Sequence, residues 1–158
     1  MLDLNQVTLV ADMASSLKVW GSLVALLCLQ CRLLVHGHDI SRKEFMAEHY
    51  LNPSQQFHVY RCDVLMREKA LKHKTSHLFI YASWYKIKQV CNSVNWKKLY
   101  RNAYIWAQTP IKVLKCHWNS FTNSYREIRS YSYVQFHCNM DGYVESIEDM
   151  KTIDTVFY

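Results

Sequence analysis

The sequence predicts an α+β protein, because segments with helical spacing come first and segments with strand alternation follow. Trp84, Ile87 and Cys91 are three and four residues apart, so they share one face of a helix. Later in the chain Val134 and Phe136 alternate with Tyr, Gln and His, which is the two-residue period of a half-buried strand. The helical segments and the strands are therefore expected to pack as two layers around one core.

The first 37 residues have the composition of a secretory leader. Lys18 gives a positive start, an apolar run covers 19–29, and compact residues precede Gly37. This run is shorter than the roughly 20 apolar residues that cross a membrane. We therefore expect residues 1–37 to be an N-terminal extension plus a signal peptide, with cleavage near Gly37.

Two further details refine this leader. Asp3 and Asp12 are unusual before a signal peptide, so we expect Met13 to be the functional start. Cys28 and Cys31 have the spacing of a redox motif, but such a motif should open a helix in a βαβ unit, and we interpret both as part of the discarded peptide. The remaining chain is expected to be one secreted, extracellular domain covering 38–158.

The expected elements of this domain follow from spacing and from local stop signals. Ser83 is a plausible N-cap for the third helix, and Pro53 stops the first helix from continuing. The expected helices are 41–50, 63–71 and 83–91, and the expected strands are 76–81, 102–107, 111–118, 125–138 and 142–148.

Four cysteines remain after the leader, namely Cys62, Cys91, Cys116 and Cys138. An even number in an oxidising compartment predicts two disulfides, each worth about 2–4 kcal/mol. Four cysteines allow three pairings, and composition does not choose among them. The formal net charge of +6 is scattered along the chain without a run of like charges, which favours a solvated surface over a polyanion-binding patch.

The stretch "EFMAEHY" contains the first candidate for chemistry. Phe45 and His49 are four residues apart, so on a helix the imidazole would lie against an apolar wall. Such a histidine is either a general base or a ring that packs and hydrogen-bonds, and one imidazole alone does not decide between them.

The order of elements and several strings resemble the pancreatic-type ribonuclease superfamily. "FMAEH" has a phenylalanine four residues before a histidine, "HKTSHLF" aligns with the family's lysine signature, and "YVQFHC" and "DGYV" align with a late strand and turn. The resemblance implies a ribonuclease A-like α+β fold for 38–158, with three short N-terminal helices packed on a bent antiparallel β-sheet. It also implies the disulfide pairs Cys62–Cys116 and Cys91–Cys138.

Other strings are similar to one divergent branch of this superfamily, the epididymal secretory protein E-three family. They are "YRCDVLMRE", "NAYIWAQ" and "DGYVESIEDM". This similarity implies a secreted protein of the epididymis with a role in sperm maturation. Its expected partner is a protein of the sperm surface or of the epididymal fluid. Weak binding of RNA or another polyanion is expected besides this partner. We expect a monomer without a cofactor or a membrane span.

The superfamily cleaves RNA with one neutral histidine, one protonated histidine and a lysine that stabilises the phosphorane. The resemblance assigns the base to His49 and the cation to Lys74, but the acid position falls on Ile147. Leu78 stands where the family has a base-reading threonine, and Glu48 where it has a glutamine that contacts phosphate. We therefore predict that His49 and Lys74 are relics of a catalytic site and that the protein is not an enzyme.

Three other histidines could in principle supply the acid, and His77 is the best placed of them because it precedes Leu78 on a predicted strand; the others are His117 and His137. His73 and His77 are four apart, but zinc needs three or four convergent ligands, and we expect no metal site. The alternatives to an inactive binding protein are a residual or altered ribonuclease, an RNA-binding protein and a cationic host-defence protein.

Overall fold

The computed structural model describes the backbone of residues 4–92 and 99–156. In the first helix it describes the side chains of 18–30 and 40–49. The chain separates into two compact units, Met1–Asp39 and Ile40–Tyr158, and we describe each by itself.

The first unit is helical in its described part, which belongs to α1 (Leu4–His49). All described side chains from 18 to 30 are exposed, among them Trp20 and Leu27. Among the described residues, no helix is long and apolar enough to cross a membrane. The predicted start at Met13 and the cleavage near Gly37 are not tested by this backbone and remain predictions.

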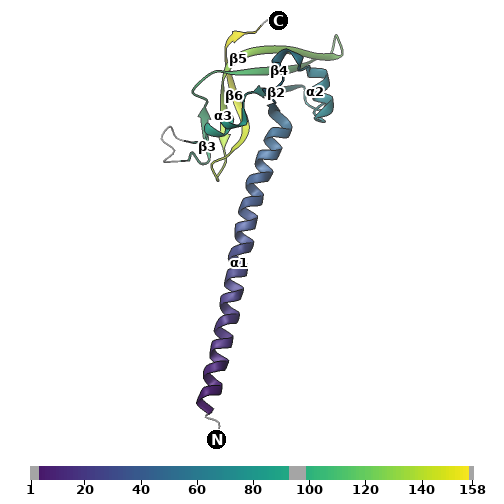
Figure 1. Cartoon of the computed structure of the whole chain (residues 1–158). Helices are drawn as coiled ribbons and strands as arrows, with labels where there is room; N and C mark the ends of the chain where they lie inside the picture. Colours follow the sequence, from purple (N-terminus) through teal and green to yellow (C-terminus); the bar gives the residue numbers. More distant parts are fainter. Residues whose placement is uncertain (1–3, 93–98, 157–158) are drawn as a thin grey trace. The chain divides into compact units, whose positions relative to one another are not determined.

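In the second unit, short helices and strands are interspersed as far as α3, and strands alone follow, all in one sheet (Figure 1). After α1 they are β1 (Tyr50–Leu51), the 3-10 helix η1 (Phe57–Val59), α2 (Cys62–Glu68), β2 (Ser76–Tyr81), α3 (Trp84–Gln89), β3 (Ala103–Trp106), β4 (Ile111–Asn119), β5 (Ser124–Cys138) and β6 (Val144–Thr155).

These bounds confirm most of the predicted elements and correct two. The expected first helix, 41–50, is the end of the longer α1 (Leu4–His49), and it stops at His49 because Tyr50 pairs with Ile80 of β2. The expected last strand, 142–148, begins at Val144 and runs on to Thr155, because β5 is long enough to pair with it throughout. The turn η1 was not predicted.

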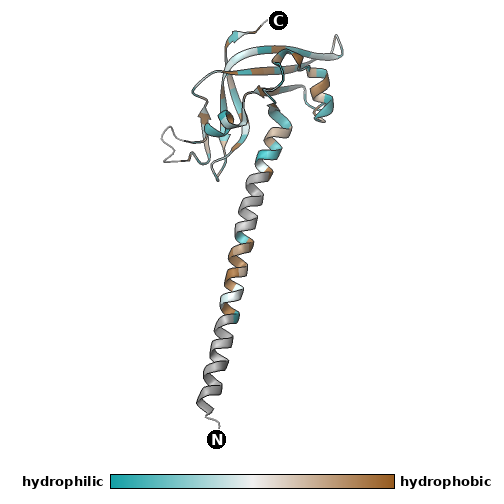
Figure 2. Ribbon diagram, in the orientation of Figure 1, coloured by the Kyte–Doolittle hydropathy of each residue, from teal (hydrophilic) through white to brown (hydrophobic). Residues whose placement is uncertain are grey.

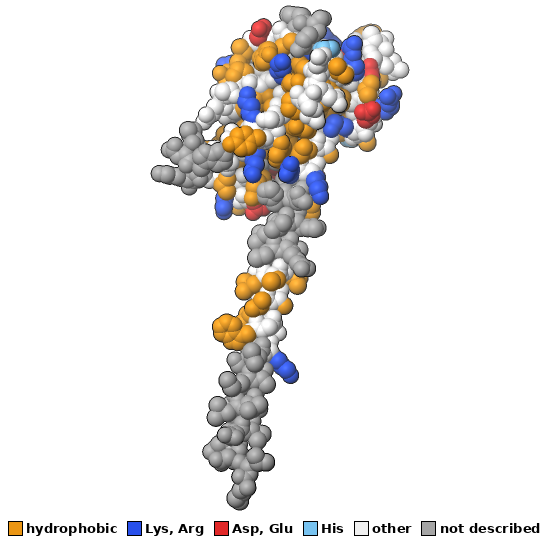
Figure 3. Space-filling view, in the orientation of Figure 1, with side chains coloured by type: hydrophobic (Ala, Val, Ile, Leu, Met, Phe, Trp, Pro, Cys, Tyr) orange, Lys and Arg blue, Asp and Glu red, His pale blue; other side chains and the backbone are white. Residues whose placement is uncertain are grey.

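The sheet is built around β5, which pairs with three other strands. The strand order is β1-β2-β4-β5-β3, and β6 also pairs with β5. In Figure 1, β4 and β5 run side by side as long strands. The sheet is antiparallel as predicted, except that the two residues of β1 pair with β2 in parallel. Lys and Arg side chains are spread over the face shown in Figure 3, in agreement with the scattered charge.

A tight turn before β6 fixes where that strand begins. Gly142 has a φ of +83° and its N–H donates to the carbonyl of Asn139 at 3.0 Å. A Cβ at Gly142 would lie 3.0 Å from the Cβ of Leu99, so both the conformation and the space favour glycine. This turn starts the register in which Ile147 lies opposite Phe136.

The core consists of two apolar clusters, each joined to one disulfide. The first contains Phe45, Phe136 and the Cys91–Cys138 bridge, and the second contains Phe79 and the Cys62–Cys116 bridge. Both bridges have the pairing that the resemblance implies. Hydrophobic residues alternate with polar ones along the strands in Figure 2, as expected for a sheet with one covered face.

Candidate functional site

His49 is held at the end of α1 by packing on the first core cluster. The ring of Phe45 lies 5.2 Å from the His49 ring and 6.2 Å from the Phe136 ring, measured between centroids. Lys69 Nζ donates to the carbonyl of Ala47 at 2.7 Å, which satisfies a backbone acceptor that the end of a helix leaves unpaired. The shared face predicted for Phe45 and His49 is confirmed.

A hydrogen bond fixes the tautomer of His49. Its Nδ1 lies 2.9 Å from the carbonyl oxygen of Leu78, and because that oxygen only accepts, Nδ1 carries the proton. Burial lowers the pKa of His49, although the bond to Leu78 and the charge of Glu48 oppose the shift. The ring is therefore neutral at pH 7, with the lone pair on Nε2. This is the state in which an imidazole serves as a base.

His77 packs directly against His49. The two rings are stacked, with centroids 4.6 Å apart and planes inclined by 11°. His77 Nε2 donates to the backbone carbonyl of Glu48 at 2.8 Å, and burial lowers the pKa of His77 to about 4. Rings in contact leave no space for a phosphate between them, so this geometry does not let His77 act as the acid opposite His49.

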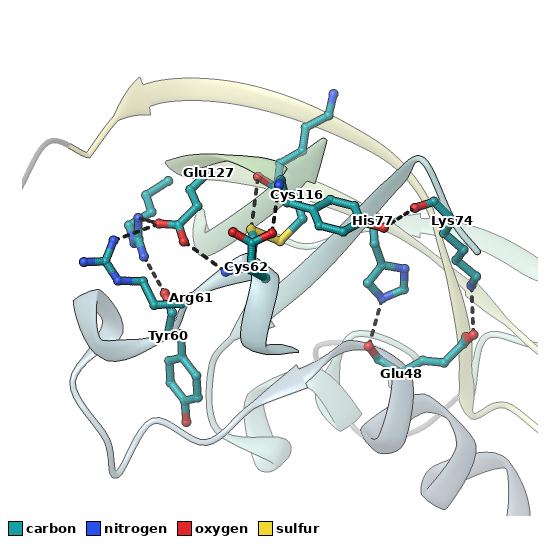
Figure 4. Close-up of a disulfide and its surroundings, with 12 residues drawn as sticks. Glu48, Tyr60, Arg61, Cys62, Lys74, His77, Cys116 and Glu127 are labelled. Atoms are coloured by element: carbon teal, nitrogen blue, oxygen red, sulfur yellow. Dashed lines mark hydrogen bonds and ion pairs between the residues drawn. A yellow bond between two sulfur atoms is a disulfide. The ribbon is translucent and has the colours of Figure 1, made fainter. Parts of the chain in front are cut away.

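The Glu48 carboxylate lies between His49, to which the resemblance assigns the role of base, and Lys74, to which it assigns the role of the phosphate-stabilising cation. One oxygen is 2.9 Å from Lys74 Nζ and the other is 3.5 Å from His49 Nε2. Figure 4 shows Glu48 reaching toward Lys74 while its backbone carbonyl faces His77. The hydrogen bond from Lys74 lowers the pKa of Glu48, so the carboxylate is ionised at neutral pH. The chain thus supplies its own anion to Lys74.

Ile147 presents a hydrocarbon side chain to the same region of the core. It pairs with Phe136 across β5 and β6 and packs, partly buried, on the cluster that contains Phe45. A β-bulge follows at Glu148, because Gln135 pairs with Asp149 while Phe136 pairs with Ile147. An isoleucine at this place holds no transferable proton.

The remaining histidines of the sequence analysis lie elsewhere. His137 is paired with Glu145 at 2.8 Å, and its ring packs on Tyr104. His117 is exposed and faces Ser76 across the sheet, and His73 is also exposed. Within the described part of the chain, no three His, Cys, Asp or Glu side chains converge as metal ligands.

Sequence reasoning missed two features of this site, namely the Glu48–Lys74 pair and the burial of His77. The pairing of Glu48 with Lys74 joins α1 to the loop before β2, and no local pattern encodes a contact over 26 residues. The burial of His77 could have been found, because His77 and Phe79 occupy alternate positions of β2 and share its buried face.

The histidine stack predicts an acid-sensitive fold. The folded pKa of His77, about 4, lies below the unfolded value near 6.5, so stability is full above pH 6.5 and is lost as the pH falls toward 4. Protonation of His77 therefore removes about 3 kcal/mol of unfolding free energy once the pH is below the folded pKa. The lowered pKa values of His49 and Glu48 act in the same direction.

The His77→Gln variant keeps a donor for the Glu48 carbonyl and removes the titration. Urea unfolding between pH 7 and 4 should show a flatter decline of the unfolding free energy for this variant. His117→Gln changes an exposed histidine on β4 and should keep the original decline. Equal slopes for all three proteins would show that His77 does not carry the acid sensitivity.

A family profile and two solved structures show to which family the domain belongs. The family profile described as pancreatic ribonuclease matches residues 40–150. Amphinase, a cytotoxic ribonuclease from Rana pipiens oocytes, has a similar fold with a TM-score of 0.57 and 14% identity over 72% of this chain and 99% of its own. Green turtle egg white ribonuclease gives a TM-score of 0.56 and 15% identity over 72% and 98%. The chain belongs to the pancreatic ribonuclease family.

Two human relatives then define the branch of that family. Epididymal secretory protein E3-beta is 59% identical over 145 residues, which cover 91% of this chain and 99% of that protein. Epididymal secretory protein E3-alpha is 53% identical over the same shares of both chains. The resemblance drawn from strings such as "YRCDVLMRE" and "DGYVESIEDM" is therefore confirmed.

Proposed function

We propose that this protein is secreted in the epididymis, does not cleave RNA, and acts by binding a protein of the sperm surface or of the epididymal fluid during sperm maturation. The observation that carries the proposal is the Glu48 carboxylate between Lys74 and His49, together with a hydrocarbon at position 147. The names of the two human relatives support the tissue and the secretion.

The charge of Glu48 acts against a phosphate substrate. The Glu48 carboxylate and the Lys74 ammonium are both partly exposed, and a surface pair of this kind contributes only about 0–1 kcal/mol to stability. Its effect on chemistry is larger than its effect on stability, because it cancels the one cation assigned to the phosphorane. Loss of a positioned general acid lowers the rate by a further factor of about 10²–10⁴.

The loss of cleavage leaves the fold free to serve binding. Tyr104 and Trp106 on β3 are 61% and 41% exposed, and Tyr and Trp are enriched in protein interfaces. Among the described elements β3 pairs only with β5, so it lies at an edge of the sheet. These aromatic side chains support a protein partner for the secreted domain.

A second function, residual or altered ribonuclease activity, has one observation in its favour. His49 keeps the Nδ1 hydrogen bond and the neutral Nε2 that a general base requires. A cationic surface also favours weak association with RNA. This activity would need a proton donor other than the side chain at 147.

The experiment that separates these functions uses the purified, oxidised chain and its His49→Ala variant. We expect equal background cleavage of RNA by both proteins from pH 5 to 8, and saturable binding of the labelled protein to epididymal sperm. Reduced and alkylated protein is the control and should lose the binding. RNA cleavage that disappears with His49→Ala would favour the ribonuclease, and absence of saturable binding to sperm or to fluid proteins would contradict the proposed partner.

A further inference from the structure

A basic cavity lies where β6 ends beside β5, and none of its described lining residues belongs to the His49 site. Its volume is about 570 Å³, and its charged lining comes from Arg61, Arg126, Glu127 and Arg129, with His58 beside them. The backbone N–H of Val156 donates to the carbonyl of Arg129 at 2.8 Å and closes the sheet at this point. A cavity of this size accommodates a small organic group rather than a lone ion.

Glu127 acts as the internal support of this cavity. One of its oxygens accepts from the Cys62 N–H at 3.0 Å, and the other lies 2.8 Å from Nη1 of Arg129 and 3.4 Å from Nη1 of Arg61. Figure 4 shows Glu127 between Arg61 and the Cys62–Cys116 bridge. Burial opposes ionisation of Glu127, but the bonds from Arg129 and Cys62 outweigh it and lower its pKa. The carboxylate therefore stays ionised and holds two guanidinium groups together.

The three arginines differ in how firmly they are placed. Arg129 is only 12% exposed, donates to the carbonyl of Tyr60, and lies over the ring of Phe57. The Arg61 side chain is 68% exposed, and Arg126 is also exposed. Arg129 thus anchors the wall of the cavity, while the exposed Arg61 and Arg126 are accessible from solvent.

We propose that this cavity binds a sulfate ester of a sulfated glycan, with Arg61 and Arg126 as the residues that contact the sulfate. Three guanidinium groups against one carboxylate leave an excess of positive charge, and the planar guanidinium matches the paired oxygens of a tetrahedral oxyanion. The proposal goes beyond the proposed function and does not depend on it.

The lining also distinguishes a glycan from a nucleic acid. Proteins that bind single-stranded RNA combine basic grooves with aromatic side chains on which the bases stack. Among the described residues, which end at Val156, the cavity is lined by no Phe, Tyr or Trp side chain, and its apolar part comes from Ile128 and Val156. A cavity that offers guanidinium groups but no aromatic rings favours a ligand that is recognised through its anionic groups, such as a sulfated glycan, over a ligand with bases that stack.

The test measures binding of a heparin hexasaccharide to the full chain by calorimetry at several salt concentrations. The Arg61→Gln/Arg126→Gln variant should bind about tenfold or more weakly, because two charge-assisted contacts are lost. Its salt slope should fall by about two. The matched control, Lys88→Gln/Lys151→Gln, removes the same charge from two exposed lysines and should bind within about twofold of the unchanged protein.

Two further arms complete the design. The Arg61→Lys/Arg126→Lys variant keeps the charge and should still bind more weakly, because an ammonium lacks the paired donors of a guanidinium. A single-stranded RNA of equal charge should bind more weakly than the hexasaccharide. The proposal would be overturned if Arg61→Gln/Arg126→Gln and the control Lys88→Gln/Lys151→Gln lost the same amount of affinity for the hexasaccharide. No measurable binding of the hexasaccharide, or tighter binding of the RNA, would also overturn it. Unchanged unfolding midpoints verify that the variants are folded.

Discussion

The double variant Glu48→Gln/Ile147→His is expected to cleave RNA at least about a hundredfold faster than the unchanged protein. Glu48→Gln removes the carboxylate that faces Lys74 and His49, and Ile147→His supplies an imidazole on the strand position that pairs with Phe136. A positioned general acid is worth about 10²–10⁴ in rate. The measurement is cleavage of a short RNA between pH 5 and 8.

The single variants and a triple variant serve as controls for this gain. Ile147→His alone should gain less than the double variant, because Glu48 still competes with phosphate for Lys74. Adding His49→Ala to the double variant should remove the activity, since the base would then be missing. A folded double variant with no more activity than the unchanged chain would show that position 147 does not face the phosphate.

Removal of the Cys91–Cys138 bridge is expected to cost about 4 kcal/mol of unfolding free energy. The bridge spans 47 residues, and chain-entropy arguments give this magnitude for a loop of that length. Both sulfur-bearing residues are buried in the first core cluster beside Phe136, so the Cys91→Ala/Cys138→Ala variant also loses packing. Urea unfolding of the oxidised proteins gives the difference.

Lys88→Ala/Lys151→Ala is the matched control for the disulfide variant. Both lysines are exposed residues of the folded domain, so this double replacement should leave the unfolding free energy within about 0.5 kcal/mol. A loss below about 1 kcal/mol for the double alanine variant would mean that the bridge contributes little to this fold, contrary to the expectation for a small domain.

The fold was accessible from the sequence wherever one face of an element is buried. The alternation of Val134 and Phe136 along β5 and the spacing of Ile87 and Cys91 near α3 report burial directly, and both are buried as predicted. The start of α1 and the end of β6 were not accessible. Those boundaries depend on whether neighbouring backbone continues to pair, and the exposed residues of β6 beyond Met150 carry no apolar pattern.

The candidate site also has a part that the sequence predicts and a part that it does not predict. Contacts within one element, such as Phe45 on His49, follow from the helical repeat. Contacts between elements, such as Glu48 with Lys74 or His77 stacked on His49, depend on how α1 meets β2, and a single sequence does not specify that meeting. The resemblance pointed to Glu48 as an unfavourable charge, while the structure adds that this charge is already paired.

The most direct test of the central claim is a titration of the His49 ring signals by NMR with inorganic phosphate, in the unchanged protein and in Glu48→Gln. The chain's own carboxylate lies between His49 and Lys74, so phosphate should leave the ring signals of the unchanged protein in place and shift them saturably in Glu48→Gln. A saturable shift of equal affinity in the unchanged protein would contradict the account, because it would show that Glu48 does not keep phosphate away from His49.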